Sequence, residues 1–314
     1  MRFATVSLVE SISIVSTTEV DVTGISELLE QWVSRQLGDE ALSWLKQQRE
    51  EISAGTEDWV FFTSFSGVPR YTGKADLVLS EQDMQAADEV RSGWDPTGWS
   101  VDQAGRTLIL LSRPAEDPDE YVETLEQIFT TADVGESVAL YQSLPLLPHP
   151  DRWVDRAKEG LRTNMSSVFN AVALRNPYPR EHFDEGAWNQ MVLKAIFVGT
   201  PLHPIQGLDA RSNRKLARML HDYAHERWAA SRDVKPELWR PVGPFAEGEL
   251  LEDLVRVMKE GDDIEQEAAA LALSDSPADE SDKLLAEYPE LRGRIERGEL
   301  TWETFSRERM AAGE

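Results

Sequence analysis

The clearest chemical pattern in the chain is a pair of histidines four residues apart. His221 and His225 lie in the string HDYAHE, inside a stretch whose apolar spacing predicts a helix over residues 213–231. Side chains at positions i and i+4 share one face of a helix, so both imidazoles could bind one metal ion. The string also differs from the zinc pattern H-E-x-x-H only in having Asp222 at its second position.

A zinc site needs a third protein ligand, and the pattern does not supply one. His203 and Asp209 are the nearest candidates, but neither has a diagnostic spacing. An enzyme built here would bring them into one cleft with the two histidines and with Asp222 or Glu226. The more ordinary interpretation is structural: the histidines hydrogen-bond a neighbouring loop or a buried helix contact.

A larger set of polar residues in the middle of the chain has the composition of a site for a small anionic or polyhydroxylated metabolite. Arginine and lysine would bind the anion, and amides would bind hydroxyl groups. Apolar neighbours such as Phe169 and Trp188 place some of these side chains in a groove between helices. The alternative is that they are helix caps and buried structural hydrogen bonds. The set comprises Arg162, Asn164, Asn170, Asn189, Lys194, His203, Asp209, Arg211 and His225.

Residues 61–79 form the clearest irregular segment, with the sequence FFTSFSGVPRYTGKADLVL. Its glycines and proline are typical of turns. Arg70 and Lys74 place two cations beside those turn residues. We expect this segment to be a ligand-binding loop.

No complete catalytic motif occurs in the chain. There is no Gly-x-Ser-x-Gly turn, no phosphate-binding G-x-x-x-x-G-K-[ST] loop and no G-x-G-x-x-G after a strand. The absence of cysteine excludes thiol catalysis and cysteine-ligated metal sites, and it suits a reducing compartment, so we expect a cytoplasmic protein. No cofactor is expected.

The charge of the chain argues against two classes of partner. A net charge of −25 and a pI near 4.6 disfavour binding to nucleic acid or to anionic membranes, which need a basic surface. No apolar run reaches the length of a membrane span, and Glu10 interrupts any export signal. Residues 151–245 are the exception in charge, with 15 Lys+Arg against 11 Asp+Glu. They suit an anionic metabolite, unless these cations pair with acidic neighbours.

The elements that must position these residues are helices. Ile25, Leu28, Leu29, Trp32 and Val33 show the helical spacing that recurs along the chain. Prolines and glycines separate the helical stretches, and little length remains for a sheet. We predict helices over residues 25–33, 39–53, 80–91, 100–113, 117–131, 134–144, 150–160, 164–173, 185–198, 213–231, 247–260, 264–274, 279–288 and 301–310.

An array of more than ten helices with short loops predicts an all-α fold. Successive helix pairs of similar length favour an α-α superhelix or a solenoid-like arrangement, although no strict sequence period is present. Four tryptophans at helical spacing are expected in the core rather than in a ligand site, namely Trp153, Trp188, Trp228 and Trp239.

Several long strings of the chain together resemble the EboA family of metabolite traffic proteins. The resemblance runs from about Ile25 to Asp275. The strings are GKADL at 73–77, GWDPTGWSVDQAGR at 93–106, TADVGESVALYQSLPLLPHP at 131–150, AKEGLRTNMSSVFNAVALRNPYP at 157–179, FDEGAWNQMVLKAIFVGTPLHPIQGLD at 183–209 and LARMLHDYAHERWAASRDVKPELWRPVGPF at 216–245.

The resemblance implies a place in secondary metabolism. Genes of this family are found with genes for a prenyltransferase, a TatD-like hydrolase and enzymes resembling dehydroquinate synthase and sugar-phosphate isomerase. This implies a role in making or moving a cyclitol-like or prenylated metabolite, with those pathway enzymes as partners. No catalytic residue carries over, so we expect an accessory binding protein; the alternatives are an uncharacterised, metal-dependent enzyme of the same pathway and a pure protein scaffold.

The sequence divides into three parts. Residues 1–22 alternate weakly and are expected to form a weak strand or a loose tail. Residues 23–276 form the helical domain that resembles the family. Residues 277–314 are expected to be an acidic helical extension, either a solvated surface or a docking segment for a partner.

Overall fold

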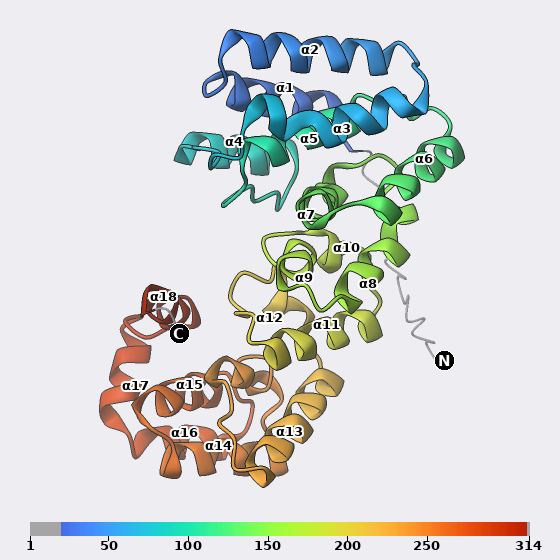
Figure 1. The fold of residues 1–314 in the computed structure, drawn as a ribbon. Coiled ribbons are helices and arrows are strands. Elements are labelled where there is room, and N and C mark those ends of the chain that lie inside the picture. The colour runs from blue at the N-terminus through green and yellow to red at the C-terminus, as the bar shows by residue number, and fades with distance from the viewer. Residues whose placement is uncertain (1–19, 313–314) are drawn as a thin grey trace, which may run out of the picture.

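The computed structural model describes residues 20–312, which form an elongated array of helices (Figure 1). Within these residues no strand forms, and the β-pairing consists of one antiparallel bridge between Asp76 and Ser100. The predicted all-α fold is therefore confirmed. The predicted strand or tail over residues 1–22 lies almost entirely outside the described residues.

The helices follow one another along the chain with short connections. They are α1 (Val22–Ser34), α2 (Asp39–Ser53), α3 (Asp58–Thr72), α4 (Glu81–Val90), α5 (Val101–Leu111), α6 (Pro118–Thr131), α7 (Val134–Ser143), α8 (Val154–Arg162), α9 (Ser166–Ala173), α10 (Tyr178–His182), α11 (Glu185–Val198), α12 (Leu208–Arg211), α13 (Arg214–Ala229), α14 (Glu249–Glu260), α15 (Asp263–Ser274), α16 (Asp279–Ala286), α17 (Pro289–Glu296) and α18 (Trp302–Ala312). Short 3-10 turns cover Leu144–Leu146, Pro150–Trp153, Pro236–Trp239 and Gly243–Phe245.

The predicted helix starts are explained by side-chain caps. Ser80 and Asp133 each form a capping box with the residue three positions later, and Asp117 accepts hydrogen bonds at the start of α6. The prediction from sequence did not include three short helices, α10, α12 and α17. It also extended the helix at 150–160 over a proline-led 3-10 turn that precedes α8.

The prediction of an irregular loop over residues 61–79 was wrong for residues 61–72, because residues 58–72 form α3, whereas residues 73–79 are irregular as predicted. Phe61, Phe65 and Val68 lie buried on one face of this helix, at helical spacing. Proline at position 69 has no N–H to donate to the carbonyl of Phe65, four residues earlier. Arg106 of α5 donates its Nε to that carbonyl instead, at 3.3 Å. A partner from another helix therefore compensates for the proline.

The long helices pack mainly against their neighbours along the array. α5 contacts α1, α3 and α7; α7 contacts α9, α9 contacts α11, and α11 contacts α13. α13 then contacts α14, which packs on α15. Such neighbour-to-neighbour contact is typical of solenoid-like arrays. Three of the four tryptophans expected in the core, Trp153, Trp188 and Trp239, are fully buried, and Trp228 packs partly buried against it.

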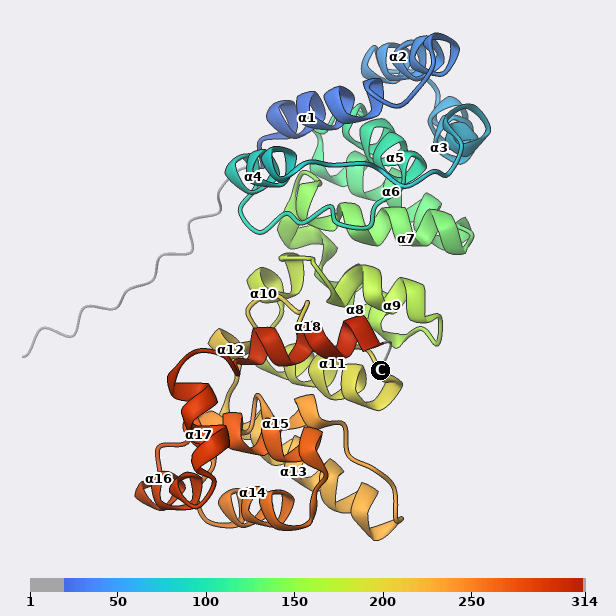
Figure 2. The same ribbon diagram turned by 90° about the vertical axis from the view of Figure 1, so that its left-hand side faces the viewer.

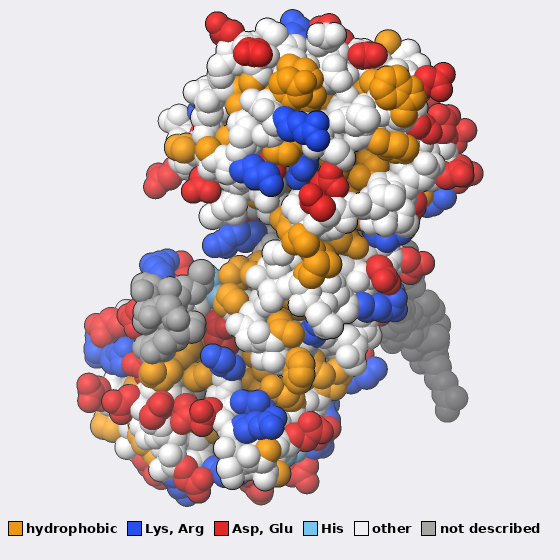
Figure 3. Space-filling view, in the orientation of Figure 1, with side chains coloured by type: hydrophobic (Ala, Val, Ile, Leu, Met, Phe, Trp, Pro, Cys, Tyr) orange, Lys and Arg blue, Asp and Glu red, His pale blue; other side chains and the backbone are white. Residues whose placement is uncertain are grey.

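The two ends of the array widen into lobes that meet at a narrower waist formed by α7 to α10 (Figure 3). Asn176 is buried there, and its amide joins three helices. Its Nδ2 donates to the carbonyls of Tyr141 in α7 and Ala171 in α9, and its Oδ1 accepts the N–H of Tyr178 in α10. Every polar atom of this side chain is thus used to fix the waist.

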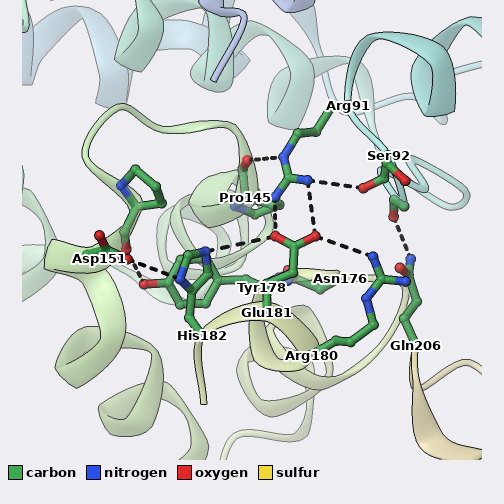
Figure 4. Close-up of polar contacts among 12 residues, drawn as sticks. Arg91, Ser92, Pro145, Asp151, Asn176, Tyr178, Arg180, Glu181, His182 and Gln206 are labelled. Atoms are coloured by element: carbon green, nitrogen blue, oxygen red, sulfur yellow. Dashed lines mark hydrogen bonds and ion pairs between the residues drawn. The ribbon is translucent and has the colours of Figure 1, made fainter. Parts of the chain in front are cut away.

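An arginine connects the waist to the first lobe (Figure 4). Arg91, at the end of α4, donates to the carbonyl of Pro145 at 2.9 Å and forms a two-pronged ion pair with Glu181 of α10. Beside it, Gln206 donates to the carbonyl of Gly93 at 2.6 Å. These contacts set the position of residues 91–100 over the waist.

The C-terminal helices α16, α17 and α18 all pack on α15, so they continue the array. α18 lies across the long axis of the array (Figure 2). Ser306 on this helix donates to Glu237, and Trp302 donates to Asp275. Among residues 20–312, no helix is long and apolar enough to cross a membrane.

Replacement of Gly160 by alanine is expected to lower the free energy of unfolding. A Cβ atom at this position in α8 would lie 2.6 Å from the Tyr141 ring and 2.9 Å from Val172. Forcing an extra methyl group into such a packed contact costs about 1–3 kcal/mol. Urea unfolding followed by circular dichroism would measure the change.

Gly67→Ala is the matched control, since Gly67 also lies inside a helix. Its added Cβ would meet Trp44 at an ordinary 3.7 Å. Alanine should therefore leave the protein equally stable or stabilise it by about 0.5–1 kcal/mol. Equal effects of the two substitutions would contradict the close packing of α8 against α7.

Candidate functional site

The waist contains a cavity of about 210 Å³ between the 91–100 segment and the helices α7 and α9. Its lining joins residues from both sides of the waist. Trp94, Asp95, Thr97 and Trp99 belong to the 91–100 segment, Val138 and Gln142 to α7, and Ser167, Asn170 and Ala171 to α9; Pro145, Leu174, Arg175 and Asn176 complete it.

Aromatic packing and turns hold the 91–100 segment in place. Trp94 is buried with its ring centroid 5.2 Å from that of Trp32 in α1 and 6.1 Å from that of Trp99. Asp95 accepts the N–H of Thr97 at 3.0 Å, which closes a turn around Pro96. The side of the cavity formed by this segment is therefore fixed by the core of the first lobe.

Two buried polar atoms of the lining residues have no hydrogen-bond partner among the described residues. They are the indole Nε1 of Trp94 and the Oε1 of Gln142. Leaving such a group unpaired in the protein interior costs about 1–3 kcal/mol. One is a donor and the other an acceptor, which is what a hydroxyl group of a ligand can satisfy.

The charged groups of the cavity are only loosely engaged with each other. Arg175 Nε lies 3.9 Å from the nearest Asp95 oxygen, and each side chain is about one-third exposed. Arg175 also has a positive φ of 52°, held by a hydrogen bond from its N–H to the carbonyl of Pro204. Such a backbone conformation is strained for a residue with a side chain and is often found at functional sites.

Of the predicted polar set, Asn170 lies at this cavity, where its Oδ1 accepts from Thr200 at 2.9 Å. The three predicted cations are not among its lining residues and have neighbours of their own. Arg162 is exposed and pairs with Glu159. Lys194 donates to the carbonyls of Leu161 and Thr163 at the end of α8.

Arg211 is a structural residue of the same kind. It donates to the carbonyls of Pro179, Arg180 and Phe183, and its guanidinium lies 4.7 Å from the Trp188 ring. Burial lowers the pKa of Arg211 below its usual value. Arg211 therefore caps α10 and is not available to an anion.

The remaining predicted residues are dispersed. Asn189 is fully buried and exchanges two amide hydrogen bonds with Asn213, at 3.1 and 2.8 Å. Asp209 forms a bidentate ion pair with Arg240, and Asn164 is exposed. Burial, more than the nearby Arg240, lowers the pKa of His203.

Arg70 and Lys74 are both exposed. Arg70 lies in the last turn of α3, and Lys74 follows that helix in an extended connection. They do not flank the loop that we expected at residues 61–79, because that segment is mostly helix.

The histidine pair meets a carboxylate that sequence spacing did not indicate. His221 Nδ1 lies 2.6 Å from one Asp253 oxygen, and His225 Nε2 lies 2.9 Å from the other. Asp253 belongs to α14, in a part of the sequence that spacing does not connect with the histidines. The expected third ligands, His203 and Asp209, are not part of this group.

The cations of residues 151–245 are largely neutralised, as the alternative interpretation of the charge predicted. Arg152, Arg156 and Lys158 pair with Asp119, Glu126 and Asp184. Arg214 and Arg218 of α13 pair with Glu247 and Glu249 at the start of α14, and Arg240 pairs with Asp209 of α12. The local excess of positive charge therefore does not by itself mark an anion site.

A wider hollow of about 680 Å³ lies between α11, α15 and α18. Three of its four acidic residues are already engaged: Glu237 accepts from Leu202 N–H and from Ser306, and Asp262 and Glu265 cap the start of α15. The waist cavity, with its unpaired polar atoms, is the better candidate for a ligand.

Comparison with known proteins identifies the family of this chain. Residues 25–243 match the model of a family described as metabolite traffic protein EboA. The match confirms the resemblance drawn from the sequence, and it includes every residue that lines the waist cavity. No curated protein and no solved structure matches the chain.

Replacement of Arg211 by alanine is expected to destabilise the protein, whereas Arg162→Ala should not. Arg211 would lose three hydrogen bonds to carbonyls and the contact with Trp188, which together are worth at least about 2 kcal/mol. Arg162 would lose one exposed ion pair, with a change within about 0.5 kcal/mol. Thermal and urea unfolding would test this, and a stable Arg211→Ala variant would show that the capping contacts are dispensable.

Proposed function

The chain belongs to the EboA family of metabolite traffic proteins, and on that premise we propose that it binds a small polyhydroxylated, anionic metabolite in the waist cavity. It acts as an accessory binding protein, which carries or presents its ligand to an enzyme of the same pathway. The absence of cysteine supports a cytoplasmic location for this step.

The observation that carries the proposal is the pair of unpaired polar atoms in the cavity lining. Trp94 Nε1 can donate and Gln142 Oε1 can accept, so two residues of the lining carry hydrogen-bonding groups that no protein atom satisfies and that a small side-chain adjustment could turn to ligand hydroxyl groups. Asn170 adds an amide, and Asp95 a carboxylate acceptor. Aromatic rings with amides and a carboxylate form a suitable surface for a ring that carries several hydroxyl groups.

The size of the cavity favours a single ring over a prenyl chain. A water molecule occupies about 30 Å³ of liquid, so 210 Å³ corresponds to about seven waters. That is room for one cyclitol-like or sugar-like ring. A long isoprenoid would need a deeper and more apolar channel than a lining that contains Asp95, Arg175 and several amides.

Arg175 supplies the group that would bind an anionic substituent. Its contact with Asp95 at 3.9 Å is too long for a strong hydrogen-bonded ion pair, so the guanidinium can bind a phosphate or carboxylate of the ligand. Arg175 lies in the short connection between α9 and α10, where its positive φ sets the direction in which the side chain leaves the backbone.

Binding of ring polyol phosphates should depend on Arg175. Isothermal titration calorimetry with myo-inositol monophosphate and a hexose phosphate, compared with farnesyl phosphate and inorganic phosphate, would identify the ligand class. Arg175→Ala should weaken binding of the polyol phosphate at least tenfold, or about 1.4 kcal/mol. Gln142→Leu, which removes the unpaired acceptor, should weaken binding of the unphosphorylated polyol as well.

Arg162→Ala is the matched control, because it removes an arginine that lies outside the cavity. Its affinities should equal those of the unmodified protein. Tighter binding of farnesyl phosphate than of any polyol, or affinities that survive Arg175→Ala and Gln142→Leu, would contradict the proposed site.

A further inference from the structure

A group of potential metal ligands lies in the second lobe, on helices that do not line the waist cavity (Figure 1). His221 and His225 extend from one face of α13, one helical turn apart, and Asp253 faces them from α14. One ligand atom from each residue lies within 4.8 Å of the others. Among the described residues, no other group of three histidine, aspartate or glutamate side chains could hold a metal ion in this way.

The position of Asp253 requires a positive charge beside it. It lies on the buried face of α14, between Leu250 and Leu254, and its side chain is 8% exposed. A buried carboxylate is costly without a compensating charge. The partners that the structure gives Asp253 are the two imidazoles, with no lysine or arginine among its contacts.

We propose that His221, His225 and Asp253 bind a divalent transition-metal ion, with Zn²⁺ as the best fit. Two imidazoles and one carboxylate are a ligand set that zinc takes with a fourth position open. A metal ion would also place a positive charge beside the buried carboxylate. This site is independent of the metabolite cavity, so either proposal can fail without the other.

The geometry needs only side-chain adjustment to bind zinc. With bonds of about 2.0–2.1 Å in a tetrahedral site, ligand atoms lie about 3.3 Å apart. The two histidine–aspartate contacts would lengthen slightly from 2.6 and 2.9 Å, and the imidazoles would turn toward a common point. The ring centroids are already 4.4 Å apart.

In a metal-bound imidazole, the ring proton lies on the nitrogen that faces away from the ion. A ring nitrogen that binds a metal must present its lone pair, so the ring proton moves to the outer nitrogen. The outer Nε2 of His221 lies 4.0 Å from a carboxylate oxygen of Asp222. Carboxylates at the outer nitrogen commonly orient metal-bound histidines. Asp222, which made the sequence resemble a zinc pattern, is not one of the grouped ligands, and at 4.0 Å its carboxylate is too far from Nε2 for a direct hydrogen bond.

The site opens to solvent on the side of His225, whose side chain is 51% exposed, while His221 and Asp253 are largely buried. Trp228 packs edge-on against His225, and Arg256 lies 4.2 Å from the Trp228 ring. The fourth coordination position would therefore be reached from solvent and occupied by water or by a small ligand.

The test is a titration of the tag-free, chelator-treated protein with Zn²⁺ by calorimetry and with Co²⁺ by visible absorption. We expect one equivalent of metal, with the intense visible bands of tetrahedral Co²⁺. His225→Ala and Asp253→Asn should each weaken binding at least tenfold. His225 is half exposed, so its substitution is expected to leave the fold intact, which circular dichroism would check.

His203→Ala is the matched control, because the sequence marked His203 as a third ligand and the structure excludes it from the group. It should bind metal as the unmodified protein does. Absence of binding at micromolar metal, or binding that survives His225→Ala and Asp253→Asn, would overturn the proposal. In that case the three residues serve only as a hydrogen-bonded link between α13 and α14.

Discussion

The arrangement of the molecule depends on one buried amide at its waist. Asn176 satisfies the backbone of α7, α9 and α10 at once, and it does so where the chain passes from the first lobe to the second. Removing it would break these three hydrogen bonds, including the one that Asn176 donates to the carbonyl of Ala171, and losing a hydrogen-bond partner is costly in the interior. The same residue lines the waist cavity, so the interaction that fixes the fold also fixes the walls of the candidate site.

The positions of several arginines follow from the same need to satisfy backbone carbonyls where helices meet. In an acidic chain, arginines are placed where helices must be connected: Arg91 joins α4 to α10, and Arg211 caps α10 from α12. Each supplies several donors in a fixed planar geometry, which suits helix ends with unpaired carbonyls. Residues that resemble an anion site in sequence can therefore be structural, and Arg175 differs because its guanidinium has no close partner of this kind.

The two proposed sites differ in how they relate to the array. The waist cavity forms where two parts of the array meet, so its lining comes from segments about eighty residues apart, such as Asp95 and Arg175. The metal group forms between two helices that neighbour each other in the array, α13 and α14.

The sequence by itself determined the helices. Apolar spacing, serine and aspartate caps, and prolines at helix ends are local signals, so most helix positions were predicted, and so was the all-α class. The local signal failed where distant contacts compensated for it: at Pro69, Arg106 from another helix takes over the carbonyl that the proline leaves unpaired.

The sites were decided by tertiary structure. The two histidines were identified from their spacing within one helix, but Asp253 meets them only because α14 packs beside α13. Likewise, Trp94 and Arg175 share a cavity only because the waist brings their segments together. Periodicity along one chain segment records which face of a helix is buried, but not which other helix covers that face, and a binding site needs both.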